Sequence, residues 1–178
     1  MPSEVKSLAE LESKISEAGD KLVLLYFGAL WCRPCKIAAP KLAELEKEYP
    51  DMTMLKIDAD EADELCFLFG VEILPSFICI KETLVLYELH GLNIEKLIEI
   101  IQKYYNCDVK TLKEKPKTYI NMIEAGYKKI KEIKALIEAT LKDEVSELPV
   151  TTRTSTEIKG KGKPGTKTGK PKVFQPKP

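Results

Sequence analysis

The chain has 178 residues, of which 44% are hydrophobic, so it can bury one core of ordinary size and carry an extension. No apolar run approaches the roughly 20 residues of a membrane-spanning helix, and the charged N-terminus, MPSEVKSLAELESK, lacks the apolar segment of a secretion signal. With five cysteines and no such signal, we expect a reducing compartment, the cytoplasm, and no membrane association.

The net charge of zero conceals an asymmetry between the two parts of the chain. Residues 1–107 carry 19 acidic and 11 basic side chains, a net charge of −8. Residues 108–178 carry 9 acidic and 17 basic side chains, a net charge of +8. This change of sign predicts a boundary near Asp108.

The first 106 residues predict an alternation of helices and strands. In chain order we expect helix Ser7–Glu17, strand Leu22–Gly28, helix Pro34–Glu48, strand Thr53–Asp58, helix Ala62–Phe69, strand-like segment Val71–Ile80, strand Leu84–Leu89 and helix Ile94–Tyr105. In the helix Pro34–Glu48, the apolar spacing predicts that Ile37, Leu42 and Leu45 face the core. This order predicts an α/β fold with a central mixed sheet and helices on both faces.

The chemistry-bearing motif is Cys32-Arg33-Pro34-Cys35, which lies between the first strand and the helix after it. Pro34 suits the first turn of a helix, because its missing N–H would have no helical partner there. Cys32 is therefore expected at the mouth of the helix and Cys35 one turn inside it. The partial positive charge of a helix N-terminus favours a thiolate, and two intervening residues let the sulfurs bond or separate.

Two other interpretations of the CxxC motif compete with a redox pair. A structural zinc site needs about four ligands, usually as two spaced pairs, whereas this chain has one CxxC and a single histidine, His90, far along the sequence. The cysteines could also be structural and inert. The strand–CxxC–helix context favours the redox pair, and we expect neither a metal nor a cofactor. Cys66 and Cys79 are expected to be buried free thiols.

Residues 1–106 resemble thioredoxin along the whole of that fold. The resemblance rests on WCRPCK at Trp31–Lys36, Ala39-Pro40, LKIDAD at Leu55–Asp60, GVEILPSF at Gly70–Phe77, and Gly91. It implies the thioredoxin fold and exchange with protein disulfide substrates, supplied with electrons by a reductase. It implies that Cys32 is the nucleophile, that Cys35 is the resolving thiol and that Pro75 is cis and faces both. The substrate groove that it implies consists of Trp31, Arg33, Pro34, Ile73, Leu74, Pro75 and Gly91.

Two positions depart from the usual thioredoxin pattern. Arg33 replaces the glycine of WCGPC, and a cation beside Cys32 is expected to favour its thiolate and to make the pair more oxidising. Tyr26 stands six residues before Cys32, where thioredoxins usually have a buried aspartate that helps to deprotonate the resolving cysteine. A tyrosine hydroxyl is a poor base near neutral pH, so the second departure predicts slow turnover.

Beyond the resemblance we expect a linker over 107–117, a long amphipathic helix over 118–148 and a disordered basic tail over 149–178. The helix has an apolar stripe that either packs back on the domain or binds a partner helix. The stripe consists of Ile120, Ile123, Tyr127, Ile130, Ile137 and Leu141.

The tail has 8 basic residues and 1 acidic residue, with 5 prolines and 4 glycines. It is either a solvated arm or one that binds an acidic polymer. A microtubule fits such an arm, whereas nucleic acid fits less well, since Phe174 is the only aromatic residue available for stacking. The alternative to an exchange enzyme is therefore a structural thioredoxin-like subunit of a cytoskeletal assembly, associated with microtubules or axonemal dynein and held through 118–178.

Overall fold

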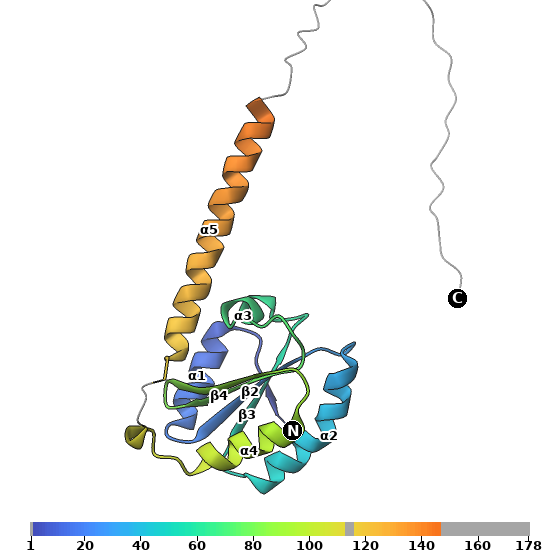
Figure 1. Cartoon of the computed structure of the whole chain (residues 1–178), viewed down its shortest axis with the longest axis vertical. Helices are drawn as coiled ribbons and strands as arrows, with labels where there is room; N and C mark the ends of the chain where they lie inside the picture. Colours follow the sequence, from blue (N-terminus) through green and yellow to red (C-terminus); the bar gives the residue numbers. More distant parts are fainter. Residues whose placement is uncertain (1, 113–115, 147–178) are drawn as a thin grey trace, which may run out of the picture.

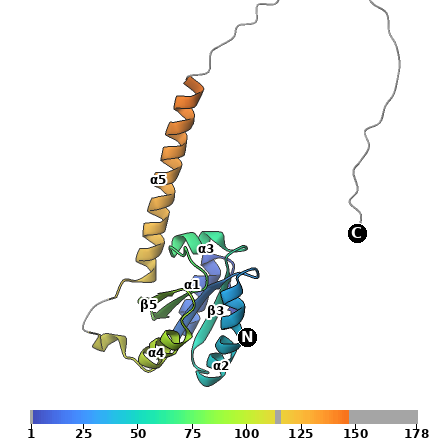
Figure 2. The same ribbon diagram turned by 45° about the vertical axis from the view of Figure 1, so that its right-hand side comes forward.

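Strand β2 (Leu22–Gly28) lies at the centre of a five-stranded sheet in the order β1-β3-β2-β4-β5 (Figures 1 and 2). The computed structural model describes residues 2–112 and 116–146. The strands are β1 (Ser3–Glu4), β2, β3 (Thr53–Asp58), β4 (Ser76–Lys81) and β5 (Leu84–His90). The helices are α1 (Leu8–Ala18), α2 (Arg33–Glu48), α3 (Asp63–Leu68), α4 (Ile94–Tyr105), a 3-10 turn (Val109–Thr111) and α5 (Tyr119–Ser146).

The sheet is mixed, because β1, β3 and β2 run parallel whereas β4 and β5 pair antiparallel to their neighbours. All seven residues of β2 are buried, as its continuous apolar sequence predicts for a strand that is covered on both faces. Leu22, Leu24 and Tyr26 belong to the core under α2 and α4, while the alternate residues belong to the core under α1 and α3. The predicted thioredoxin fold, a mixed sheet flanked by helices, is confirmed.

One local expectation was wrong, and strand β1 was not expected at all. Ile37 is 58% exposed and does not face the core as predicted, because Ala38 takes its place in the buried stripe of α2, whereas Leu42 and Leu45 are buried as predicted. Within the strand-like segment Val71–Ile80, the strand itself begins directly after Pro75, at Ser76, the first residue of β4. Strand β1 has two exposed residues and no apolar alternation, which left no signal for it in the sequence.

The segment before α5 is tied to the edge of the sheet. The N–H of Val85 donates to the carbonyl of Lys117 at 2.8 Å, and the N–H of Tyr119 donates to the carbonyl of Thr83 at 3.0 Å. Thr118 thereby forms a β-bridge with Leu84. The residues that precede the helix thus satisfy backbone groups of the hairpin edge, as an added strand would.

The first turns of α5 then pack on the domain, and the rest of the helix leaves it. Tyr119 and Ile123 are buried, and the hydroxyl of Tyr127 donates to Glu64 of α3 at 3.4 Å. From residue 131 to 141 every side chain is exposed, and Figure 1 shows the helix projecting past α3. The helix therefore has a docked first part and an undocked second part. The predicted tail over 149–178 lies outside the described residues.

Gly126 sets how closely α5 approaches α3. A Cβ atom at this position would lie 2.8 Å from the Cα and 2.9 Å from the Cδ2 of Leu68. Because one of these atoms is backbone, the contact cannot be relieved by rotating a side chain. Glycine lowers helix propensity by about 1 kcal/mol relative to alanine, so close packing is the physical reason for it here.

We predict that Gly126→Ala loosens the docked part of α5, because the overpacking cost of about 1–3 kcal/mol exceeds the gain in helix propensity. Hydrogen exchange should become faster at the amides of Val85 and Tyr119, whose hydrogen bonds join the start of α5 and the segment before it to the hairpin edge. Glu124→Ala, an exposed substitution in the same turn, is the control and should leave both rates unchanged. Unchanged protection in the Gly126→Ala variant would contradict this account of the docking.

Candidate redox site

Cys32 is the N-cap residue of α2, and it forms a disulfide with Cys35. The chain leaves β2, turns through residues 29–31 and enters the helix at Arg33, with Pro34 in the first turn. The Sγ atom of Cys32 accepts a hydrogen bond from the N–H of Cys35 at 3.2 Å. Sulfur thus occupies the place that a serine or aspartate oxygen usually takes at an N-cap, where the backbone donors favour negative charge.

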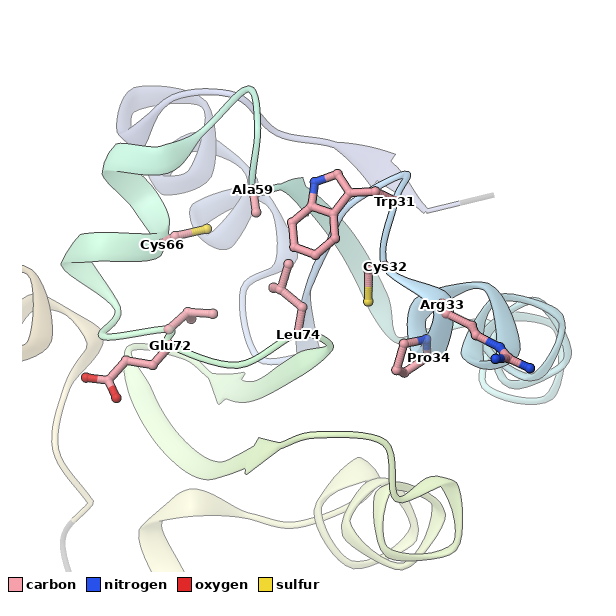
Figure 3. Close-up of a pocket in the computed structure, with 9 residues that line it drawn as sticks. Trp31, Cys32, Arg33, Pro34, Ala59, Cys66, Glu72 and Leu74 are labelled. Atoms are coloured by element: carbon pink, nitrogen blue, oxygen red, sulfur yellow. The ribbon is translucent and has the colours of Figure 1, made fainter.

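A cavity of about 460 Å³ opens beside the disulfide, and Cys32 is one of the residues that line it (Figure 3). It brings together four residues that the resemblance assigned to the groove, namely Trp31, Arg33, Pro34 and Leu74. It also contains residues that the sequence analysis did not assign to it: Ala59, Cys66, Val71 and Glu72. Trp31 and Leu74 point into the cavity, whereas the guanidinium of Arg33 points away from it.

Trp31 is held over the cavity although it is 68% exposed. Its Nε1 donates to both carboxylate oxygens of Asp60, each at 3.0 Å. The N–H of Asp60 donates in turn to Asp58 Oδ1 at 3.1 Å, which fixes the turn after β3. A charged acceptor strengthens the bond from the indole, so Asp60 is a positioning residue for the wall of the cavity. Sequence spacing could not identify it, because it lies 29 residues from Trp31.

Of the other predicted groove residues, Ile73 and Pro75 lie on the loop before β4 and Gly91 follows β5, and none of the three lines this cavity. The Leu74–Pro75 peptide bond is cis, as the resemblance implied. The N–H of Gly91, which has a φ of 85°, donates to the carbonyl of Pro75 at 2.8 Å. Ile73 is 56% exposed at the start of the loop. Backbone hydrogen bonding therefore joins Gly91 to the loop of Ile73, Leu74 and Pro75.

Ser76 connects this loop to His90, a residue to which the sequence assigned no role. The hydroxyl of Ser76 donates to the carbonyl of Ile73 at 2.6 Å, and the same oxygen lies 3.0 Å from Nδ1 of His90. A serine hydroxyl has one proton, which is used toward Ile73, so Nδ1 of His90 must be the donor in the second bond. The pair thus braces the loop from the side of β5.

Tyr26 lies in the core on the other side of the disulfide. It stacks on Phe77, with ring centroids 5.4 Å apart, and burial raises the pKa of its hydroxyl. The hydroxyl therefore stays protonated near neutral pH and cannot act as a base for Cys35. A second cavity, of about 530 Å³, is lined by Tyr26, Cys35 and Lys56 among others.

Two thiols outside the motif, Cys66 and Cys79, are poor nucleophiles. Burial raises the pKa of Cys66 to about 11 and that of Cys79 to about 12. Both therefore remain protonated thiols near neutral pH, although Cys66 shares the cavity with Cys32. Among residues 2–112 and 116–146, no cluster of three or more His, Cys, Asp or Glu residues could hold a metal ion, and no helix is long and apolar enough to cross a membrane.

The family model described as Thioredoxin matches residues 3–103. The chain is 37% identical over 100 residues to a thioredoxin of Ophiophagus hannah, a match that covers 56% of this chain and 95% of that one. It is 40% identical over 101 residues to Thioredoxin-T of Drosophila melanogaster, covering 56% and 64% of the two chains.

Solved structures of thioredoxins give the same result. Fasciola hepatica thioredoxin has a TM-score of 0.56 and 33% identity, and the match covers 57% of this chain and 98% of that one. The short form of spinach chloroplast thioredoxin F has a TM-score of 0.54 and 38% identity, covering 57% and 91% of the two chains.

Gly28 makes room for Tyr26. A Cβ atom on Gly28 would lie 2.6 Å from the hydroxyl oxygen and 2.8 Å from the adjoining ring carbon of Tyr26. The ring is buried against Phe77, so it cannot move freely away. We predict that Gly28→Ala lowers the free energy of unfolding by about 1–3 kcal/mol, the usual cost of overpacking a core.

In the Tyr26→Ala background the same Gly28→Ala change should cost clearly less, since the atoms it meets are gone. Urea unfolding of the wild type, both single variants and the double variant measures this coupling as a double-mutant cycle. Additive effects of the two substitutions would show that Gly28 is not matched to the tyrosine ring.

Proposed function

The chain belongs to the thioredoxin family, and from that premise we propose that it reduces protein disulfides by exchange through Cys32 and Cys35. The observation that carries the proposal is the bonded pair at the N-terminus of α2, beside a cavity walled by Trp31 and Leu74. Dithiol exchange needs a sulfur that is both stabilised as a thiolate and reachable by another disulfide. The N-cap position supplies the first condition, and the cavity supplies the second.

In the proposed reaction the Cys32 thiolate attacks one sulfur of a substrate disulfide, and the other substrate sulfur leaves as a thiolate. A mixed disulfide then joins Cys32 to the substrate. Cys35 loses its proton and attacks the Sγ of Cys32, which forms the Cys32–Cys35 bond and releases the second substrate thiolate. The substrate gains two electrons in total, and a separate reductase must return two electrons to the pair.

The second step is the slow one in this proposal. Cys35 is only 3% exposed, and the tyrosine beside it stays protonated, so no strong base stands at this position to remove the proton. Arg33 gives little help, because its guanidinium points away from the cavity and its side chain is exposed to solvent, where charges are screened. The expected effect of Arg33 on the Cys32 thiolate is therefore smaller than its position in the sequence indicates.

A cytoplasmic location and a structural role in a microtubule or axonemal dynein assembly stay predictions from the sequence. The feature that supports the structural role is the net charge of +7 over residues 149–178, which lie outside the described residues. A basic segment of this kind would bind an acidic polymer through screened charge, so such binding would weaken as salt is added.

The proposed function predicts an order of thiol reactivity. In the reduced protein at neutral pH, Cys32 should be alkylated before the other cysteines, because it alone caps a helix N-terminus. Cys66 and Cys79 should react last, since their pKa values of about 11 and 12 leave almost no thiolate. Mass spectrometry after limited alkylation gives the order, and reaction of Cys66 or Cys107 ahead of Cys32 would refute the assignment.

The proposed function also predicts an effect of Tyr26 on turnover. Tyr26→Asp should raise the rate of disulfide reduction, because it places a carboxylate where Cys35 must lose its proton. It should also lower the free energy of unfolding, since the carboxylate is buried and the ring stacking on Phe77 is lost. Tyr26→Asn is the control of matched size and should destabilise without the gain in rate. Equal rates in the folded Asp and Asn variants would mean that the missing base does not limit exchange.

A further inference from the structure

One face of α5 is apolar both where the helix is docked and where it is not. Steps of three or four residues place side chains on the same side of a helix. The residues in these steps are Tyr119, Ile123, Gly126, Ile130, Ile133, Ile137 and Leu141. Tyr119 and Ile123 are each only 7% exposed against the domain. Further along the same face, Ile133, Ile137 and Leu141 are 45%, 53% and 54% exposed.

We propose that this uncovered part of the face, here called the free stripe (Ile133, Ile137 and Leu141), binds the free stripe of a second copy of the chain, with the two α5 helices antiparallel. None of the residues that the structure describes packs over the free stripe, and its three side chains are exposed. A single helix outside a core is marginal in water, and its stability depends on burying its apolar face. Pairing two copies provides that burial without any rearrangement of the docked part.

The position of the domain selects the antiparallel direction. The domain of each copy lies on the same face of α5 as the free stripe, at Tyr119, Ile123 and Gly126. In a parallel pair with these faces together, both domains would have to occupy the space between the helices at the same level. In an antiparallel pair each domain lies at the opposite end, beyond the stripe of the other copy. Only the antiparallel pair is therefore free of this clash.

The charges beside the free stripe fit the same arrangement. If Ile137 lies opposite Ile137 of the second copy, Ile133 lies opposite Leu141, and all three residues are covered. Lys134 and Glu138 lie on the same flank of the stripe. In an antiparallel pair, this flank of one helix faces the same flank of the other helix. Lys134 of each copy then lies near Glu138 of the other. Neither side chain has an ion-pair partner among the side chains that the structure describes, those of residues 2–112 and 116–141.

The first test is the mass of the full chain in solution with a reductant present, which excludes disulfide-linked dimers. Sedimentation velocity over a range of micromolar concentrations should show a monomer–dimer equilibrium. Ile137→Glu should raise the dissociation constant at least about 100-fold, because each dimer loses two buried isoleucine side chains. Ala135→Glu introduces the same charge on the opposite, exposed side of the helix and should leave the dissociation constant nearly unchanged.

The second test separates antiparallel self-pairing from every other arrangement. Lys134→Glu places four carboxylates together in its own dimer, and Glu138→Lys places four ammonium groups together, so each variant alone should dimerise less than the wild type. In a mixture of the two variants, the two carboxylates of one chain face the two ammonium groups of the other, so dimers should return. A parallel pair gives no such rescue, because the flank that carries residues 134 and 138 then faces the other flank of the second helix. Binding to an unrelated partner helix gives no rescue either.

Three results would overturn the proposal. The wild type could remain monomeric at every concentration, which would leave the stripe to another partner. Dimers could persist in Ile137→Glu, which would place the contact elsewhere. The mixed charge variants could remain monomeric while the wild type dimerises, which would exclude the antiparallel register. Circular dichroism of each variant checks that the domain and helix are intact, and none of the substituted residues belongs to the redox site.

Discussion

The site depends on one local arrangement, in which a sulfur atom caps the N-terminus of the helix that follows the central strand. β2 is buried on both faces, so its end is fixed by packing from two cores. The chain then turns into α2, and the free backbone N–H groups of the first turn meet Cys32. Stabilising a thiolate therefore needs no separate charged residue in the cavity. Apolar burial in the two cores, and not contacts within the site, offsets the conformational entropy that is lost when the motif is ordered.

The residues around the disulfide show how packing and chemistry constrain each other. Tyr26 fills the core beneath Cys35 and stacks on Phe77, and Gly28 lacks the side chain that would meet its ring. This pair favours stability, but it leaves a protonated hydroxyl at the place where proton removal would speed exchange. On the cavity side of the disulfide, Asp60 accepts a hydrogen bond from Trp31, and His90 is hydrogen-bonded to Ser76. The walls of the cavity are thus held by residues that do not line it.

The C-terminal helix extends the domain without enlarging its core. Its preceding segment bridges to β5, and Gly126 allows its first turns to lie against Leu68 of α3. Since α3 also carries Cys66, one short helix contacts both the cavity and the extension. The apolar face of α5 continues beyond this contact. In the undocked turns it is exposed, although an apolar helix face normally packs against another surface.

The sequence by itself determined the motif and the elements other than β1 and the 3-10 turn, because these depend on neighbours close in the chain. Three local signals agree with the structure: the continuous apolar residues of Leu22–Gly28, the proline two positions after Cys32, and Gly91. Their order was enough to indicate the family. Only the tertiary structure decided which side chains meet. Asp60 binds Trp31 across 29 residues, Tyr127 binds Glu64 across 63, and Cys66 enters the cavity from α3. Such contacts depend on how the helices pack against the sheet, and periodicity carries no information about distances between elements.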